Sequence, residues 1–265
     1  MKRRTVYCLI ILAVSLVCFF GYKQYEKLTE DRRPPVLSCE TDIIEASVSI
    51  TEEELLAGVT AVDDVDGDVT DSVVIEDISD FIKENTRIIT YVASDGNRNV
   101  GRLERTLIYT DYKEPVFELT GPLSYVIGTK INILGNIRAS STLDGDMTTK
   151  IRYGLDGVID NLAPGRYPIE YRVTDSCGKT TYFNTEIEIF DSVYAGIKVN
   201  LKKYLVYVEK GKKFNPDAYF KSSNIEGELS VVSNVNTKKE GVYYVDYYVS
   251  GINASGKSRL VVVVK

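Results

Sequence analysis

Histidine and tryptophan are absent from this chain of 265 residues, and cysteine occurs only four times. Because histidine is the commonest general base and metal ligand, its absence excludes a Ser-His-Asp triad, and a zinc or iron site would need cysteines and carboxylates alone. Cys8 and Cys18 lie in an apolar N-terminal run. Cys39 and Cys177 are too few and too far apart for a disulfide framework, so we expect both to be unpaired, with Cys177 exposed in a loop. The composition therefore predicts a protein that is not an enzyme and holds no organic cofactor.

The N-terminus predicts a membrane segment. The basic stretch KRR precedes the apolar run TVYCLIILAVSLVCFFGY (residues 5–22), which at about 18 residues is at the short end of a bilayer span. Basic residues before such a run place the N-terminus in the cytoplasm and the rest of the chain outside. A cleaved signal peptide is the alternative, but FFG at 19–21 fits a small-residue cleavage site poorly. We expect an uncleaved single-pass anchor in the lipid membrane, with residues 1–4 cytoplasmic and the later domains extracellular.

A charged segment of helical character, KQYEKLTEDRR (residues 23–33), follows the apolar run. It predicts a short stem that continues the helix out of the membrane. Pro34 and Pro35 end it, because proline and the residue before it both resist helix.

Three landmarks recur in the same order along the rest of the chain. Asp31, Asp111 and Asp191 each begin a linker and lie 80 residues apart. Each linker is followed by an acidic stretch with one glycine and then by a strand-like stretch before a polar loop. The acidic stretches are VDGDVTD (65–71), LDGDMTT (143–149) and IEGELSV (225–231); the strand-like stretches are TYVASDGNRN from Thr90, EYRVTDSCGK from Glu170 and DYYVSGINASGK from Asp246. This period fits a small β-sandwich of about seven strands, repeated three times.

Alternation of apolar and polar residues supports strands with one buried face. In RIITYVAS, Ile89, Tyr91 and Ala93 point one way, and YPIEYRVT behaves in the same manner. The sequence therefore predicts an all-β protein with three tandem immunoglobulin-like β-sandwich domains after an N-terminal transmembrane helix. We name residues 34–112 domain 1, 113–191 domain 2 and 192–265 domain 3.

The linker with D-x-x-x-P, the stretch GVTAVDDVDGDVT (58–70) and the motifs YVASD (91–95) and YRVTDSCG (171–178) resemble a known family. They are similar to the bacterial immunoglobulin-like repeat of Gram-positive surface proteins, which is also found in a crystal-toxin relative and is related to hyalin-type repeats. The third copy is degenerate. The resemblance implies a β-sandwich fold and presentation on the cell surface, and it implies no catalytic activity.

The stretch VDGDVTD has three explanations. A catalytic carboxylate pair is the weakest, because a catalytic site is seldom repeated along a string of modules. A calcium site is chemically better founded, since calcium takes six to eight oxygen ligands. Domain 1 offers Asp63, Asp64, Asp66 and Asp68 close together, and Asp95 in a loop expected at the same end of the sandwich. The third explanation is a tight turn, in which the aspartates cap backbone amides and the glycine takes positive φ.

The other two copies favour the turn. Domain 2 has Ser141 and Thr142 in place of the first two acids, and it keeps Asp144 and Asp146. Domain 3 has only a Glu-Gly-Glu stretch. Because the glycine persists while the acids vary, we expect a turn in every copy, and a weak calcium site in domain 1 stays open as the alternative.

Charge differs strongly among the domains. Counting Lys and Arg against Asp and Glu, residues 35–112 carry 5 against 18, residues 113–191 carry 8 against 11, and residues 192–265 carry 12 against 6. Scattered charges and tyrosines of this kind are usually an ordinary solvated sheet surface. The functional alternative is that basic domain 3 offers a surface to an anionic wall polymer or partner. The candidate binding residues are basic or aromatic and lie within twelve residues of one another: Lys202, Lys203, Tyr204, Tyr207, Lys210, Lys212 and Lys213.

Two functions remain open. One is a membrane-anchored surface protein whose domains bind an extracellular protein or glycan. The other is a passive stalk or accessory part of an envelope complex with no ligand of its own. A binding module predicts an exposed aromatic patch on domain 3, whereas a stalk predicts scattered tyrosines there. Because the domains are expected outside the cell, we do not expect nucleic acid as a partner.

Overall fold

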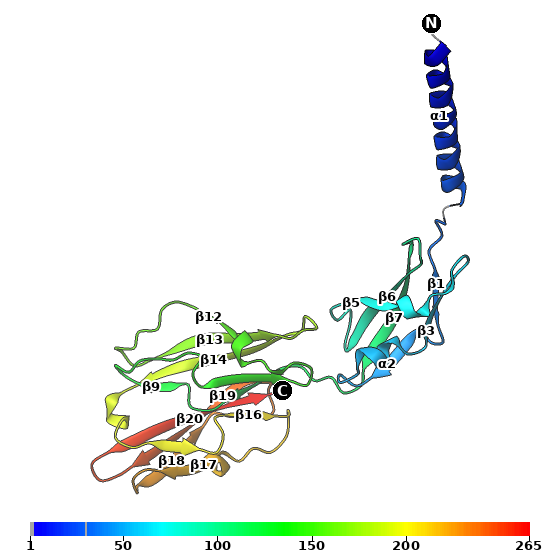
Figure 1. The fold of residues 1–265 in the computed structure, drawn as a ribbon. Helices are drawn as coiled ribbons and strands as arrows, with labels where there is room; N and C mark the ends of the chain where they lie inside the picture. The colour runs from blue at the N-terminus through cyan, green and yellow to red at the C-terminus, as the bar shows by residue number, and fades with distance from the viewer. Residues whose placement is uncertain (1–2, 30) are drawn as a thin grey trace. The chain divides into compact units, whose positions relative to one another are not determined.

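The computed structural model describes residues 3–29 and 31–265, and its chain divides into two compact units, Met1–Thr110 and Asp111–Lys265 (Figure 1). Helix α1 spans Arg3–Thr29 and includes most of the predicted stem. Its segment Val6–Tyr25 has a mean hydropathy of 2.1 and is long and apolar enough to cross a membrane. Residues 1–2 of the predicted cytoplasmic tip and residue 30 of the stem lie outside the described residues.

Domain 1 is a sandwich of two sheets. The smaller sheet has the order β1-β3-β4, with β1 at Val36–Cys39, β3 at Val59–Asp63 and β4 at Gly67–Asp68. The larger has the order β2-β7-β6-β5, with β2 at Ile43–Ala46, β7 at Val100–Tyr109, β6 at Thr86–Ser94 and β5 at Val74–Ile78. A short helix, α2 (Glu52–Leu56), begins with a capping box at Thr51 and Glu54. A 3-10 turn, η1 (Thr70–Ser72), follows β4.

Domain 2 repeats this arrangement strand for strand. Its smaller sheet has the order β11-β10-β8, with β8 at Val116–Leu119, β10 at Ile137–Ser141 and β11 at Gly145–Asp146. Its larger sheet has the order β12-β13-β14-β9, with β9 at Ser124–Val126, β12 at Arg152–Leu155, β13 at Gly165–Thr174 and β14 at Thr180–Phe190. The 3-10 turn η2 (Thr148–Lys150) occupies the place of η1.

Domain 3 keeps the larger sheet and shortens the smaller one. The larger sheet has the order β16-β20-β19-β18, with β16 at Leu205–Val208, β18 at Glu228–Ser233, β19 at Gly241–Ser250 and β20 at Ser255–Val264. The smaller consists of β15 (Val199–Leu201) and β17 (Phe220–Ser223), and the 3-10 turns are η3 (Ser192–Tyr194) and η4 (Pro216–Tyr219). In every domain the first strand of the larger sheet pairs in parallel with the last. The prediction of three β-sandwich domains after an apolar helix is confirmed.

The predicted alternation is also confirmed, and it centres on one tyrosine in each domain. Tyr91, Tyr171 and Tyr247 are all fully buried. Each hydroxyl donates a hydrogen bond to a main-chain carbonyl, at Leu55, Ile133 and Pro216 respectively. A buried tyrosine needs such a partner because an unpaired hydroxyl in the core costs free energy. Burial raises the pKa of all three tyrosines.

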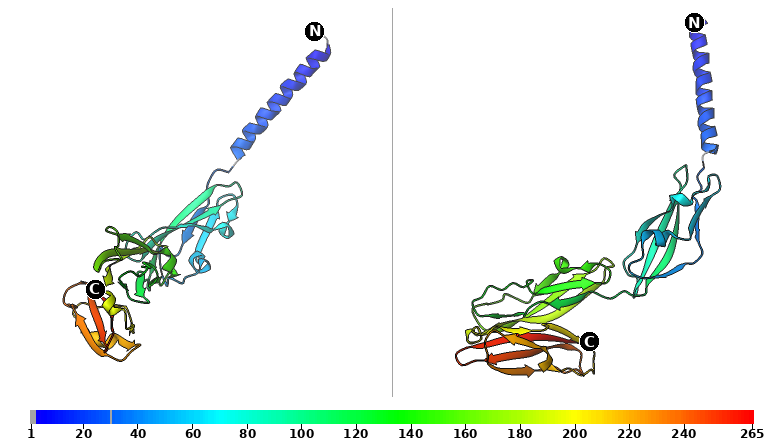
Figure 2. Two further views of the ribbon diagram at one scale, coloured as in Figure 1. Left: turned by 90° about the vertical axis from the view of Figure 1, so that its left-hand side faces the viewer. Right: turned by 60° about the horizontal axis from the view of Figure 1, so that its bottom comes forward.

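Domains 2 and 3 share a core. One cluster of buried residues includes Phe117 and Ile187 of domain 2 together with Leu205 and Val261 of domain 3. Both views in Figure 2 show the two sandwiches of this unit lying side by side. Strand β20 is therefore covered on both faces, which explains its nearly unbroken buried stretch.

Two expectations about individual residues are corrected. Cys177 is buried rather than exposed, at 1% accessibility, because its loop folds around Asp175, whose Oδ1 accepts the backbone amides of Cys177 and Lys179. Gly227 of the third acidic stretch does not adopt positive φ, unlike Gly67 and Gly145. Glycine is required at 227 because a Cβ would lie 2.7 Å from the carbonyl oxygen of Ser250.

Replacing Gly101 with alanine is expected to destabilise domain 1 by about 1–3 kcal/mol, because overpacking forces backbone shifts. The added Cβ would lie 2.0 Å from the carbonyl oxygen of Pro35. The matched control is Gly154→Ala in β12, where nothing lies within 4 Å and which we expect to be neutral or slightly stabilising. Urea unfolding of both variants in detergent micelles measures the difference. Equal stabilities would show that Pro35 does not pack against β7.

Candidate functional site

The two carboxylates of the Asp-Gly-Asp turn in domain 1 have structural partners. Oδ2 of Asp66 accepts a hydrogen bond from the amide of Gly96 at 2.7 Å, which ties the turn to the β6–β7 loop. Oδ1 of Asp68 accepts the amide of Thr70 at 3.0 Å at the start of η1. Hydrogen bonding to the side chain and the backbone of Thr70 lowers the pKa of Asp68.

Domain 2 reproduces both bonds. Oδ2 of Asp144 accepts the amide of Ser176 at 2.8 Å, and Oδ1 of Asp146 accepts the amide of Thr148 at 2.9 Å. Burial opposes ionisation of Asp144, but the bonds from Ser176 and the charge of Lys150 outweigh it and lower its pKa. Because two domains use these carboxylates in the same way, the first two aspartates of VDGDVTD and both aspartates of LDGDMTT belong to the turn.

Of the five residues predicted for a metal site, the structure brings together two, and it adds a third that the sequence analysis used only as a landmark. One carboxylate oxygen each of Asp31, Asp63 and Asp95 lies within 4.8 Å of the others. Asp64 lies outside this group and forms an ion pair with Arg33. We call Asp31, Asp63 and Asp95 the acidic cluster.

The acidic cluster is shielded from solvent and only partly hydrogen-bonded. Asp63 is 4% exposed and Asp95 is 7% exposed. Oδ1 of Asp63 accepts the amides of Val65 and Asp66, at 2.8 and 2.9 Å. Among the described residues, no partner reaches the buried Oδ2 of Asp63 or the buried Oδ2 of Asp31.

Asp95 is held in its charged form by the loop that follows it. Its Oδ1 accepts the amide of Asn99 at 2.7 Å and its Oδ2 accepts Nδ2 of Asn99 at 2.6 Å. Burial opposes ionisation, but these bonds outweigh it, so the pKa of Asp95 lies below its ordinary value.

Four of the seven candidate binding residues of domain 3 line a cleft of about 470 Å³. They are Lys202, Lys203, Tyr204 and Tyr207, and the opposite side of the cleft is residues 117–120 of domain 2. Tyr207 donates a hydrogen bond from its hydroxyl to the carbonyl of Phe117 at 3.1 Å, and burial raises its pKa to about 12. The cleft therefore exists only because domains 2 and 3 are packed together.

A second groove of about 390 Å³ adjoins the first at Tyr207 and is lined also by Lys212 and Lys213. The rings of Phe214 and Tyr219 stack within it, with centroids 5.6 Å apart. Lys265 places its ammonium 4.4 Å from the centroid of the Tyr207 ring, a cation–π contact.

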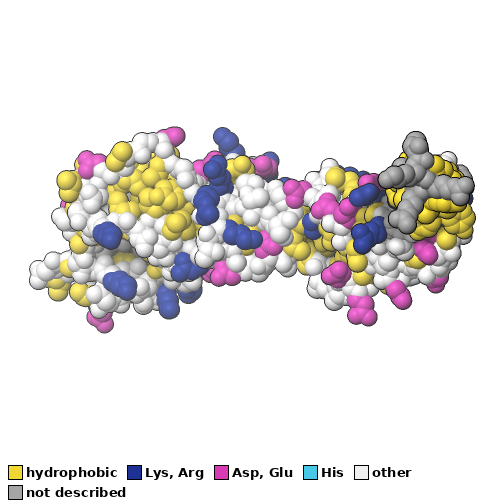
Figure 3. Space-filling model, turned by 45° about the horizontal axis from the view of Figure 1, so that its top comes forward, with side chains coloured by type: hydrophobic (Ala, Val, Ile, Leu, Met, Phe, Trp, Pro, Cys, Tyr) yellow, Lys and Arg dark blue, Asp and Glu magenta, His cyan; other side chains and the backbone are white. Residues whose placement is uncertain are grey.

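Some of the predicted basic residues are paired on the surface. Lys210 forms an ion pair with Glu240 at 3.0 Å, and Lys212 lies 3.8 Å from Glu209. Both pairs are largely exposed, and such pairs contribute little free energy. Lys203 and Lys213 are exposed. On the face shown in Figure 3, basic and acidic side chains are interspersed.

The tyrosines of domain 3 are not gathered into one exposed patch. Tyr244 packs against the core shared with domain 2, and Tyr248 packs against Tyr194 with ring centroids 5.5 Å apart. Tyr204 contacts the cores of both domains. The continuous apolar stretch at residues 260–264 of β20 is the sequence signal for this packing.

Comparisons with known proteins leave the family open. No family model matches the chain. A curated relative, an uncharacterized 81.3 kDa protein of Acholeplasma phage L2, is 29% identical over 129 residues, which cover 43% of this chain and 18% of the phage protein. The chain thus spans under a fifth of the length of that relative.

Two solved structures that match the chain are distant from it. The M60 catalytic domain with two CBM51 domains from Clostridium perfringens ZmpB is 12% identical, covering 86% of this chain and 42% of that one, with a TM-score of 0.28. Human CDH23 EC21-23 is 12% identical, covering 87% and 100%, with a TM-score of 0.23. At these scores the matches carry no inference about function, and the immunoglobulin-like character of the domains is read from their own sheet order.

Proposed function

We propose that this chain is a non-enzymatic surface protein, anchored in the membrane by α1, whose domain 3 binds an acidic protein or glycan outside the cell. The observation that carries the proposal is the pair of adjoining grooves, which combine lysines with aromatic rings. Lysine and aromatic side chains together suit contact with carboxylate-bearing chains and sugar rings. Domain 3 has 12 basic and 6 acidic residues, and this net positive charge favours a negatively charged ligand.

The remaining parts of the chain fit this role. The segment Val6–Tyr25 supports a single-pass anchor, and the basic residues before it support a cytoplasmic N-terminus. The absence of histidine supports a protein without catalytic activity, as do the structural bonds made by Asp66, Asp68, Asp144 and Asp146.

The double variant Lys212→Glu/Lys213→Glu is expected to weaken binding to an acidic ligand by about tenfold or more, because like charges would then face each other. The measurement is binding of the full chain in detergent micelles to immobilised anionic polysaccharides and to polyglutamate, over a range of salt concentrations. The matched control is Lys198→Glu/Lys221→Glu, two exposed lysines of domain 3 that line neither groove. Equal weakening in both variants would show that binding follows net charge alone and not the grooves.

The passive stalk is the second candidate. It is favoured by the packing of the tyrosines of domain 3. Tyr204 and Tyr244 pack against the core shared with domain 2, and Tyr248 packs against Tyr194, so these rings are not gathered on an exposed binding surface. If the wild-type chain binds none of these acidic polymers even at low salt, the stalk becomes the better description.

A further inference from the structure

We propose that the acidic cluster of Asp31, Asp63 and Asp95 binds a calcium ion and thereby fastens the segment after α1 to domain 1. The three residues come from three separate parts of the chain. Asp31 precedes β1, Asp63 ends β3, and Asp95 opens the loop between β6 and β7. One oxygen from each lies within 4.8 Å of the others, a spacing that one cation can bridge.

The carboxylates of the cluster carry like charges in a small space. Asp63 and Asp95 are almost entirely buried, and like charges at this distance repel. The charge of Arg33 interacts with Asp31, but the ion pair of Arg33 is with Asp64. A bound cation would offset the repulsion among the three carboxylates.

Two buried oxygens of the cluster have no hydrogen-bond donor among the described residues. These are Oδ2 of Asp63 and Oδ2 of Asp31. Buried polar atoms are nearly always paired, and one explanation of an exception is an ion that coordinates them. The other oxygen of each residue is used, Oδ1 of Asp63 by two amides and Oδ1 of Asp31 by the amide of Arg33 at 3.0 Å.

Domain 2 provides an internal comparison. Ser141 stands where domain 1 has Asp63, and its Oγ accepts the amide of Asp144 at 2.8 Å, just as Asp63 accepts that of Asp66 at 2.9 Å. The turn therefore needs only one acceptor atom, which serine supplies. The second oxygen of Asp63 is not required by the turn, so it is available for another role.

The third position of the cluster is an aspartate with a neutral donor in both domains. Asp175 of domain 2 corresponds to Asp95, and its Oδ2 accepts a hydrogen bond from the hydroxyl of Tyr112 at 2.5 Å. Oδ2 of Asp95 accepts Nδ2 of Asn99 at 2.6 Å, so the two domains differ in the number of acidic side chains that meet and not at this position. Among the described residues, only domain 1 brings three acidic side chains close enough to hold a metal ion.

The donor set selects calcium among common metals. All three side chains offer hard carboxylate oxygens, whereas zinc and copper favour nitrogen and sulfur ligands. Magnesium demands near-ideal octahedral geometry, while calcium accepts irregular sites whose remaining ligands are carbonyls and water. Outside the cell, calcium reaches the concentration at which sites of this kind, with dissociation constants of about 0.1–1 mM, are occupied.

Occupancy would act on the segment that contains Asp31. The carbonyl of Asp31 already accepts Nδ2 of Asn99 at 3.2 Å, so this segment and the β6–β7 loop are in contact. A cation shared by Asp31, Asp63 and Asp95 adds a second, stronger link between them.

Calcium binding to the full chain in detergent micelles, after removal of metal with EDTA, is the first test. Equilibrium dialysis with radioactive calcium is expected to find one ion per chain, and the Tm of domain 1 is expected to rise with calcium concentration. Asp63→Ser copies the residue of domain 2, so it preserves the turn, and it should weaken binding by about tenfold or more. Asp68→Asn is the matched control and should bind as the wild type does, because Asp68 lies outside the cluster.

The link to the segment is tested by trypsin cleavage after Arg32, which should be slower with calcium in the wild type. Asp31→Asn removes a ligand at a position outside every strand, so this variant should lose both the protection from trypsin and the tight binding of calcium even if Asp63→Ser folds poorly.

No calcium binding by the wild type at about 10 mM, well above the range for extracellular sites, would overturn the proposal. Equal binding by the wild type, Asp63→Ser and Asp31→Asn would also overturn it, since the ion would then lie elsewhere. Binding that depends on Asp63 but leaves cleavage unchanged would refute the fastening role.

Discussion

Arg259→Met is expected to destabilise the unit Asp111–Lys265 by about 3–5 kcal/mol, because it removes the most buried counter-charge from a group of largely buried carboxylates. Arg259 on β20 is 3% exposed and makes a bidentate pair with Asp246, at 2.6 and 2.9 Å. It also reaches across to domain 2, where it contacts Glu186 at 2.7 Å and Glu188 at 2.9 Å. Burial opposes its charge, but these partners outweigh burial and raise the pKa of Arg259.

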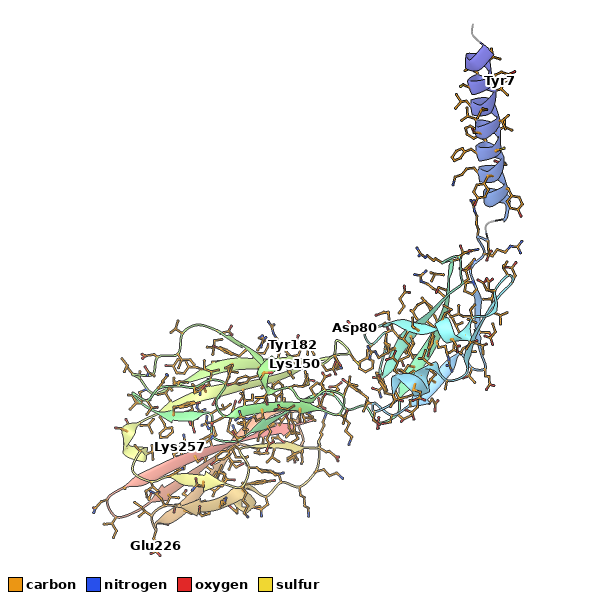
Figure 4. All side chains as sticks on the ribbon, viewed as in Figure 1. Tyr7, Asp80, Lys150, Tyr182, Glu226 and Lys257 are labelled. Atoms are coloured by element: carbon orange, nitrogen blue, oxygen red, sulfur yellow. The ribbon has the colours of Figure 1, made fainter. Side chains whose placement is uncertain are left out.

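Lys257 is part of the same network. Its ammonium lies 2.8 Å from Glu188, and both side chains are under 10% exposed. Figure 4 labels Lys257 on β20. Because Glu188 of domain 2 is shared by two cations of domain 3, the network fixes how the two sandwiches meet.

The measurement is urea unfolding of the full chain in micelles, followed by tyrosine fluorescence. The matched control is Arg102→Met in domain 1, whose pair with Glu76 is 57% and 41% exposed and should cost under about 1 kcal/mol. Glu188→Gln should cost less in the Arg259→Met background than alone, since the two residues interact. Additive losses would show that the contact between the domains is not maintained in solution.

Val261→Asp is expected to separate domain 3 from domain 2, at a cost of about 3–5 kcal/mol or more, because it places an unpaired charge in a shared core. Val261 is 2% exposed and belongs to the cluster formed mainly by domain 2 residues. Its neighbours Leu260 and Val262 instead face the core of domain 3. The substitution therefore disrupts the packing between the two domains and leaves the side chains in the core of domain 3 unchanged.

The separation is measured as a second unfolding transition at lower urea concentration and as new protease cleavage between the domains. The introduced carboxyl has a pKa raised by burial, so the variant should recover stability as pH falls and the group takes up a proton. Val232→Asp on the edge strand β18, where the side chain is 56% exposed, is the control and should have little effect. A single transition in Val261→Asp, at wild-type stability, would contradict the shared core.

The sequence by itself determined the repeated unit and its strands. Alternation placed Ile89, Tyr91 and Ala93 on one face of a strand, and the structure shows that this face is the buried one, with all three residues at 1% exposure or less. The turn at Asp66, Gly67 and Asp68 followed from the preference of aspartate for capping and of glycine for positive φ. These features are local, because they depend on residues a few positions apart.

The tertiary structure decided which distant residues meet. The sequence placed Asp63 and Asp95 at one end of the sandwich, but it gave no reason to add Asp31, whose approach depends on the pairing of β1 with β3. The sequence also did not predict that Tyr204 and Tyr207 would contact domain 2. Nor did it predict the ion pairs of Glu186 and Glu188 with Arg259. Such contacts join residues tens of positions apart, and they depend on how whole sheets pack together, which no local pattern of residues specifies.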